Sequence, residues 1–202
     1  MAQLDIWFEF ASTYSYLTVN RAERLLTQSG VSFAWRPFLL GPIFGDRGMT
    51  TSPFVLDPVR GNYMWRDVER RAARLDLPFR RPARFPANGL LAARVMTAAL
   101  DAPWSAAFAR GVYDAQFARG LDISEPAVIK EVLRRCQAPP DDWLEKAGTD
   151  AVKTALRETT DQARRLGIFG APSFTVGGEV FWGDDRLEDA IEWAVSPPPT
   201  PG

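Results

Sequence analysis

Ser12 lies where chemistry can be expected, between an alternating strand-like segment (residues 4–10) and a helical segment that ends at Gly30. The first N–H groups of a helix are unpaired and carry partial positive charge, so they stabilise an anion placed beside them. A serine here can simply cap the helix. Its hydroxyl also points to where an anionic ligand would lie, and the two interpretations are compatible.

Two further features with possible ligand roles lie near the end of the chain. Pro172 precedes a strand-like segment, where proline is unusual because it has no N–H to donate. Either a trans proline opens the strand, or a cis bond leaves the Ala171 backbone free to pair with an extended peptide. The last helical segment begins with Asp184, Asp185 and Arg186. These residues either cap the helix or bind a ligand.

The elements that must position these residues can be read from hydrophobic periodicity. Residues 4–10 and 31–38 alternate as strands around the first helix, which predicts a parallel β-α-β unit. Residues 39–58 are rich in glycine and proline and are predicted to form a loop. Residues 173–182 form a predicted hairpin around Gly177 and Gly178, followed by a final amphipathic helix.

Helical stripes occupy the middle of the chain, as at Met64, Val68, Ala72 and Leu75, and Ser124 is a predicted helix cap. The order β-α-β, helices, α-β-β-α predicts an α/β protein with a thioredoxin-like fold and an inserted all-helical domain. We expect residues 1–45 and 160–196 to form the discontinuous thioredoxin-like domain and residues 46–159 the insertion. Residues 197–202 are expected to be a disordered tail.

Composition excludes several kinds of chemistry and of partner. The chain has no histidine, which removes histidine bases, Ser-His-Asp triads and most zinc sites, so we expect no metal. The single cysteine, Cys136, cannot form an intrachain disulfide and lies in a helical pattern typical of an inert thiol. The net charge of −1 does not favour nucleic acid. No apolar stretch could span a membrane and the N-terminus lacks signal-peptide features, so we expect a cytoplasmic protein.

Six segments, taken in order, resemble one known family of enzymes. They are residues 8–17 (FEFASTYSYL), 38–42 (FLLGP), 63–70 (YMWRDVER), 85–88 (FPAN), 167–172 (GIFGAP) and 181–186 (FWGDDR). Together they are similar to 2-hydroxychromene-2-carboxylate isomerases and to the related kappa-class glutathione transferases, within the DsbA-like branch of the thioredoxin superfamily. The resemblance covers nearly the whole chain.

The resemblance implies a homodimer that binds glutathione at the strand-to-helix junction, with Ser12 orienting the glutathione sulfur and acting as the catalytic residue. It also implies a set of cofactor-binding residues, namely Ala171, Pro172, Asp185, Arg186 and Thr50. The resemblance further implies an aromatic carboxylate substrate, with Arg60, Trp65 and Asn88 as substrate-binding residues. A solvated helix face with one core tryptophan explains Arg60 and Trp65 equally well.

The sequence departs from the family pattern at several positions. Thr13 replaces a proline after the serine, Thr50 an asparagine, and Arg60 a lysine, while Asp184 replaces an uncharged residue. DsbA-like oxidoreductases carry Cys-x-x-Cys at the first motif. Ser12 and Ser15 stand at those positions here, so the protein itself cannot exchange disulfides at this site.

Three functions therefore remain open. The first is a glutathione-dependent isomerase of a 2-hydroxychromene-2-carboxylate-like substrate, in which the glutathione thiolate adds reversibly. The second is a kappa-like glutathione transferase. The third is a redox-inactive thioredoxin-fold module that binds a thiol or peptide without chemistry.

Overall fold

Four short strands form one mixed sheet in the computed structural model, which describes residues 2–196. The strands are β1 (Leu4–Phe8), β2 (Phe33–Pro37), β3 (Ser173–Val176) and β4 (Glu179–Trp182). Their order is β2-β1-β3-β4, with β1 parallel to β2 and antiparallel to β3, and with β3 antiparallel to β4. The predicted parallel unit and hairpin are confirmed, and the predicted tail 197–202 lies outside the described residues.

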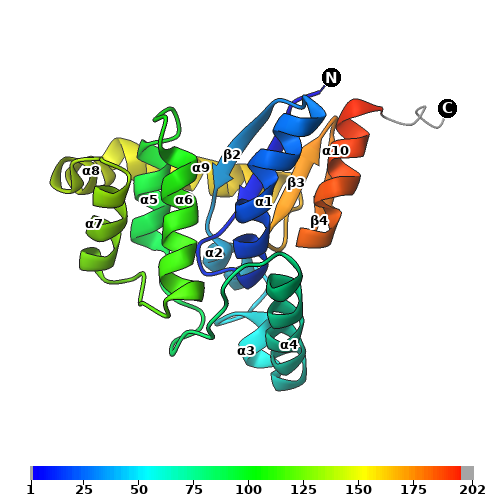
Figure 1. Cartoon of the computed structure of the whole chain (residues 1–202), viewed down its shortest axis with the longest axis horizontal. Helices are drawn as coiled ribbons and strands as arrows, with labels where there is room; N and C mark the ends of the chain where they lie inside the picture. Colours follow the sequence, from blue (N-terminus) through cyan, green and yellow to red (C-terminus); the bar gives the residue numbers. More distant parts are fainter. Residues whose placement is uncertain (1, 197–202) are drawn as a thin grey trace.

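Helices surround this sheet and fill most of the chain between β2 and β3 (Figure 1). The α-helices are α1 (Thr13–Ser29), α2 (Leu40–Gly45), α3 (Pro53–Leu56), α4 (Pro58–Arg74), α5 (Leu90–Ala98), α6 (Ser105–Tyr113), α7 (Pro126–Arg135), α8 (Pro140–Ala147), α9 (Asp150–Arg165) and α10 (Leu187–Val195). A π-helical turn, η1 (Asp114–Ala118), extends α6, and a 3-10 turn, η2 (Asp184–Arg186), leads into α10.

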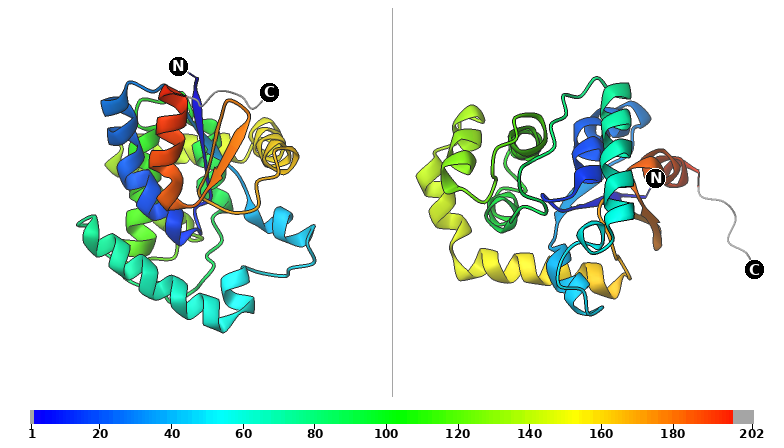
Figure 2. Two further views of the ribbon diagram at one scale, coloured as in Figure 1. Left: turned by 90° about the vertical axis from the view of Figure 1, so that its right-hand side faces the viewer. Right: turned by 90° about the horizontal axis from the view of Figure 1, so that it is seen from below.

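The alternating side chains of β1 decide which helices cover which face. Leu4, Ile6 and Phe8 are fully buried in the main core with residues of α1 and α10. Trp7 points to the other face, where it packs with Ala163 of α9 in a second cluster. Because successive strand residues face opposite sides, a single strand anchors helices on both. Figure 2 shows α1 and α10 on one side of the sheet and α9 on the other.

The helical stretch between β2 and β3 has two parts. Helices α5 to α8 gather beside the β2 edge of the sheet, and α3 and α4 lie beyond the N-terminal end of α1 (Figure 1). Most of the predicted stripe on α4 is buried, but Leu75 lies just past the helix and is 36% exposed. The division into two domains stays a prediction, and its boundary at residue 159 falls inside α9.

Two predictions about local structure were wrong. The predicted loop 39–58 contains α2 and α3, because the prolines lie in first turns, where the missing N–H has no helical partner to lose. Ser124 does not cap α7, whose N-cap is Glu125. The backbone N–H and hydroxyl of Ser124 instead donate to Asp122, at 2.9 and 2.6 Å.

A buried carboxylate joins α1, α4 and η2. The Asp184 side chain is fully buried. Its Oδ1 accepts hydrogen bonds from Thr18 Oγ1 at 2.9 Å and from Arg21 Nε at 3.2 Å, both on α1. Arg71 of α4 pairs with the other oxygen, Oδ2. Two cations thus compensate one buried anion, and α4 is held against the sheet-bearing part of the molecule.

No helix within residues 2–196 is long and apolar enough to cross a membrane.

Replacing Asp184 with asparagine is expected to lower the free energy of unfolding by about 3–5 kcal/mol, because Arg71 loses its carboxylate partner and Arg21 keeps only Glu188, which is more than half exposed. Urea denaturation followed by circular dichroism measures this. Asp185→Asn is the matched control, because the Asp185 carboxyl is about half exposed and, among residues 2–196, pairs only with the adjacent Arg186. Equal denaturation midpoints for Asp184→Asn and the unmodified protein would contradict the structural role given to Asp184.

Candidate functional site

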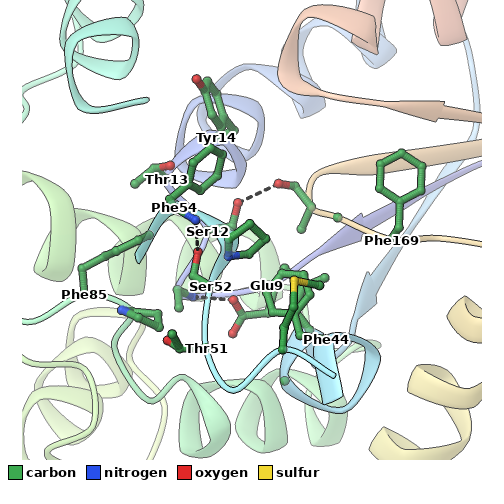
Figure 3. A pocket seen from close by; sticks show the side chains of 18 of the residues that line it. Glu9, Ser12, Thr13, Tyr14, Phe44, Thr51, Ser52, Phe54, Phe85 and Phe169 are labelled. Atoms are coloured by element: carbon green, nitrogen blue, oxygen red, sulfur yellow. Dashed lines mark hydrogen bonds between the residues drawn. The ribbon is translucent and has the colours of Figure 1, made fainter. Parts of the chain in front are cut away.

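A large cavity opens at the N-terminal end of α1, between the loop before β3 and the segments that form α2, α3 and α4. Its volume is about 1420 Å³, and aromatic side chains form much of its wall (Figure 3). A pocket for a single drug-sized ligand measures roughly 300–1,000 Å³. The cavity therefore has room for a peptide-sized ligand together with a second small molecule.

Ser12 stands in this cavity as the N-cap of α1. Its Oγ accepts a hydrogen bond from the Ser15 backbone N–H at 3.2 Å, which confirms the capping role. The same hydroxyl donates to the carbonyl oxygen of Ala171 at 2.8 Å, a contact drawn in Figure 3. Ser15 is fully buried and does not line the cavity. Of the two serines, only Ser12 is placed to meet a ligand.

The Ala171–Pro172 peptide bond is cis, which is the second of the two alternatives considered for this proline. Ala171 lines the cavity, and Pro172 is buried behind it. The Pro172 carbonyl accepts a hydrogen bond from the Gly183 N–H at 3.0 Å. Within residues 2–196 the Ala171 N–H has no hydrogen-bond acceptor. A donor and an acceptor of one backbone residue are thus presented beside Ser12.

The structure brings most of the other predicted site residues to the same cavity. Those that line it are Thr50, Arg60, Asn88, Asp185 and Arg186. Two of these side chains already have partners in the protein. Asn88 Oδ1 accepts a hydrogen bond at 3.1 Å from the N–H of Leu90, the first residue of α5, and the Arg60 guanidinium pairs with Asp57 at 3.2 Å.

Trp65 does not reach this cavity. The side chain is 6% exposed and packs edge-on against Phe85, with ring centroids 4.9 Å apart. The guanidinium of Arg81 covers its ring at 4.7 Å from the centroid. Trp65 lies on the buried stripe of α4, next to Met64 and Val68, so the core interpretation of this tryptophan holds.

Arg47 is a cavity residue that sequence reasoning missed. It lies in the connection between α2 and α3, and its guanidinium lies 5.5 Å from the ring centroid of Phe169. Three other arginines line the cavity, Arg60, Arg71 and Arg186, and each pairs with a carboxylate. Within the described chain Arg47 pairs with none, so its charge is available to an anionic ligand. No local sequence signal distinguishes it.

Glu9 was also missed, because it reads as one polar position of an alternating strand. Its carboxyl lies in the cavity, and Oε2 accepts a hydrogen bond from the Ala11 N–H at 3.1 Å. Burial raises the pKa of Glu9 from an ordinary 4.5 to about 7, and the hydrogen bond from Ala11 offsets this only in part. Glu9 therefore titrates near neutral pH.

Cys136 plays no part in this cavity. It lies at the C-terminal end of α7, packed against the main core. Burial raises the pKa of its thiol, which makes the reactive thiolate form less accessible.

Comparisons with known proteins agree with one another. The family model described as DSBA-like thioredoxin domain matches residues 3–192. The 2-hydroxychromene-2-carboxylate isomerase of Sphingobium xenophagum is 25% identical over 191 residues, which cover 92% of this chain and 94% of that protein. Glutathione S-transferase kappa 1 of Homo sapiens is 30% identical, over 92% and 87% of the two chains.

Solved structures show the same fold. A selenomethionine 2-hydroxychromene-2-carboxylate isomerase superposes with a TM-score of 0.82 at 23% identity, covering 93% of this chain and 91% of that one.

A cysteine introduced at position 12 is expected to have a thiol pKa lowered into the range of about 3.5–7.5, because the α1 N-terminus stabilises its thiolate. The pH dependence of alkylation by iodoacetamide, in a Cys136→Ala background, measures this. The matched Ser15→Cys variant is expected to react only on unfolding, because position 15 is fully buried. Similar labelling of both variants would show that the α1 N-terminus is not arranged as described.

Proposed function

The chain belongs to the DSBA-like thioredoxin family, and from that premise we propose that it is a glutathione-dependent isomerase of a 2-hydroxychromene-2-carboxylate-like aromatic carboxylate. One observation carries the proposal: the Ser12 hydroxyl caps α1 beside the Ala171 carbonyl, inside a cavity with room for a tripeptide and a second molecule. Because Ser12 and Ser15 replace the two cysteines of the oxidoreductase motif, the reactive sulfur must come from the ligand.

Glutathione binding would rearrange the hydrogen bonds of Ser12. A serine has a single hydrogen to donate, and Ala171 O accepts it at 2.8 Å in the structure. An extended cysteinyl residue of glutathione can pair with Ala171 by donating its N–H to that oxygen and accepting from the Ala171 N–H. The Ser12 hydrogen is then released to the thiolate, and the N-terminus of α1 adds to its stabilisation.

The γ-glutamyl end of glutathione carries an ammonium and a carboxylate close together. Asp185 and Arg186 present the complementary pair of charges at one side of the cavity, each about half exposed. Arg186 now pairs with Asp189 at 2.7 Å, so ligand binding would compete with an exposed ion pair that contributes little to stability. Thr50 also lines the cavity and is a further hydrogen-bonding group.

The remaining space fits a flat anionic substrate. Phe44, Phe54, Phe85 and Phe169 supply apolar surface, while Arg47 supplies a cation without a carboxylate partner in the described chain. Arg60 and Asn88 also line the cavity and can contribute secondary contacts. In the proposed reaction the glutathione thiolate adds to the substrate, the ring opens, a bond rotates and the thiol leaves.

A kappa-like transferase activity is the second candidate. The 30% identity to human glutathione S-transferase kappa 1 favours it, and the same thiolate would then displace a leaving group from an electrophile. Glutathione-dependent turnover of a hydroxychromene carboxylate supports the isomerase, whereas conjugation to chlorodinitrobenzene alone supports the transferase. If the protein binds glutathione but catalyses neither reaction, the result supports a thiol-binding module without catalytic activity.

The proposal also covers the oligomeric state and the cellular location of the protein. We infer a homodimer in the cytoplasm; sedimentation equilibrium and cell fractionation test the two statements separately.

Ser12→Ala is expected to lower the glutathione-dependent rate near neutral pH by about tenfold to a hundredfold, because a charge-assisted hydrogen bond contributes about 1.5–3 kcal/mol. Steady-state kinetics at saturating glutathione measure this. Thr159→Ala, on α9 and away from the cavity, is the control for an equal loss of a hydroxyl. An unchanged rate in Ser12→Ala would remove Ser12 from the mechanism.

Arg47→Gln is expected to raise KM for the aromatic carboxylate about tenfold with little change in kcat, because it removes binding shared by ground state and transition state. Arg66→Gln is the matched control, since Arg66 is exposed on α4, pairs with Glu69 and does not line the cavity. Equal KM values for the two variants would place the substrate carboxylate elsewhere.

A further inference from the structure

We propose that the Glu9 carboxyl accepts the thiol proton when bound glutathione becomes a thiolate, and returns it when the thiol is released. This inference rests on the glutathione-dependent function proposed above. It assigns a second catalytic residue to the site, next to Ser12 and with a different role. Ser12 donates a hydrogen bond, whereas Glu9 carries the proton.

Glu9 is held rigidly at the end of β1. Its backbone carbonyl accepts from the Ser12 N–H at 2.9 Å and from the Tyr113 hydroxyl at 2.8 Å. Its carboxyl Oε2 accepts from the Ala11 N–H at 3.1 Å. Three contacts thus fix both the backbone and the side chain. Figure 3 shows the carboxyl in the same cavity as the Ser12 hydroxyl.

The second carboxyl oxygen, Oε1, is the one available for a proton. Within residues 2–196 it accepts no hydrogen bond. It lies against the start of α5, where a Cβ on Gly89 would come within 3.2 Å of it. The absence of a side chain at Gly89 leaves room for the carboxyl to face the cavity.

The charged groups around the cavity do not neutralise Glu9. The titratable and charged residues that line the cavity besides Glu9 are Tyr14 of α1, Arg47 of the α2–α3 connection, Arg60, Tyr63, Asp67 and Arg71 of α4, and Asp184, Asp185 and Arg186 of η2. Tyr113 of α6 contacts the Glu9 backbone carbonyl through its hydroxyl. None of the arginines forms an ion pair with Glu9. Its pKa of about 7 has burial as its main cause, and a group with a pKa near the working pH is best suited to take and return a proton.

The chain offers few other groups that could accept this proton. It contains no histidine, and Cys136 lies outside the cavity. A serine hydroxyl can stabilise a thiolate but has no capacity to accept its proton at neutral pH. The other carboxylates that line the cavity, those of Asp67, Asp184 and Asp185, each pair with an arginine. Among the described residues Glu9 is the one lining carboxylate without a cationic partner, and it supplies the acceptor.

The step balances without any added reagent. The thiol and the Glu9 carboxylate become thiolate and carboxylic acid. A sulfur electron pair then forms the C–S bond, the double bond of the substrate shifts by one position, and the ring C–O bond breaks with its electron pair left on the ring oxygen. That oxygen takes the proton of the substrate's 2-hydroxyl group. After rotation about the former double bond, the 2-oxygen forms a C=O bond, the double bond re-forms and the C–S bond breaks, and the departing thiolate recovers the proton from Glu9. In a transferase reaction the proton would instead leave with the displaced anion.

Proton balance during glutathione binding tests the proposal without turnover. At about pH 8, between the pKa of Glu9 and the roughly 8.5 of a free thiol, thiolate is followed by its ultraviolet absorbance. Proton release is followed by calorimetry in buffers of different ionisation enthalpy. The thiolate formed beside Glu9 is expected to raise the Glu9 pKa above its starting value of about 7, because like charges disfavour the ionised carboxylate. Glu9 then takes up a proton at this pH, so the unmodified protein is expected to release clearly less than one proton for each thiolate formed. Glu9→Gln is expected to release one proton for each thiolate formed.

The outcomes separate the two claims. One proton released per thiolate by the unmodified protein would overturn the role of Glu9 and leave the proposed function standing. No glutathione binding by the unmodified protein would overturn both. Glu158→Gln, an exposed carboxyl on α9 away from the cavity, is expected to behave as the unmodified protein and controls for the charge change.

The pH dependence of kcat/KM gives an independent readout. In the unmodified protein it should fall as pH drops through about 7, because protonated Glu9 cannot accept a proton. Glu9→Gln should lose this acidic limb and about a hundredfold in rate at neutral pH, and Glu9→Asp should recover part of both. A Glu9→Gln variant with the original profile would contradict the proposal.

Stability measurements on the same variants show whether a loss of rate comes from unfolding. The pKa of Glu9 is raised in the folded protein, so its contribution to stability is present at low pH and lost as pH rises through about 7. Glu9→Gln should therefore be more stable than the unmodified protein at pH 8 and gain less at pH 5. Loss of rate in a variant that is more stable cannot be attributed to unfolding.

Discussion

The antiparallel pairing of β1 with β3 is the constraint on which the site depends. The register places Trp7 opposite Ser173, so the segment after β1 and the segment before β3 meet at one end of the sheet. Ser12 and Ala171, which are 159 residues apart in the chain, then lie within a 2.8 Å hydrogen bond. The N-terminus of α1, the Ala171 backbone and the Glu9 carboxyl are all positioned by this one strand pair.

Ser12 and Glu9 have complementary roles in the proposed chemistry, because each lacks a property that the other has. Ser12 donates a hydrogen bond but cannot hold a proton, and Glu9 can hold a proton because burial raises its pKa to about 7. Neither side chain carries a thiol. In the proposed function the ligand brings its own sulfur, and the cavity of about 1420 Å³ has room for a tripeptide and a second molecule.

The position of α4 depends on the burial of one carboxylate. Asp184 binds Arg21 of α1 and Arg71 of α4 while its neighbour Asp185 remains exposed. The two adjacent acids therefore have different roles, since one holds α4 in place and the other faces the cavity. Their sequence positions differ by one residue, but the turn η2 directs them to opposite environments.

The sequence by itself determined the strand alternation, the hairpin at Gly177 and Gly178, most helical stripes and the absence of a reactive cysteine at position 12, because these depend on local periodicity and composition. Only the tertiary structure decided that Trp65 is core and that Arg47 and Glu9 face the cavity. The physical reason is that burial, ion pairing and the resulting pKa depend on neighbours contributed by elements far away in the chain, which no local pattern records.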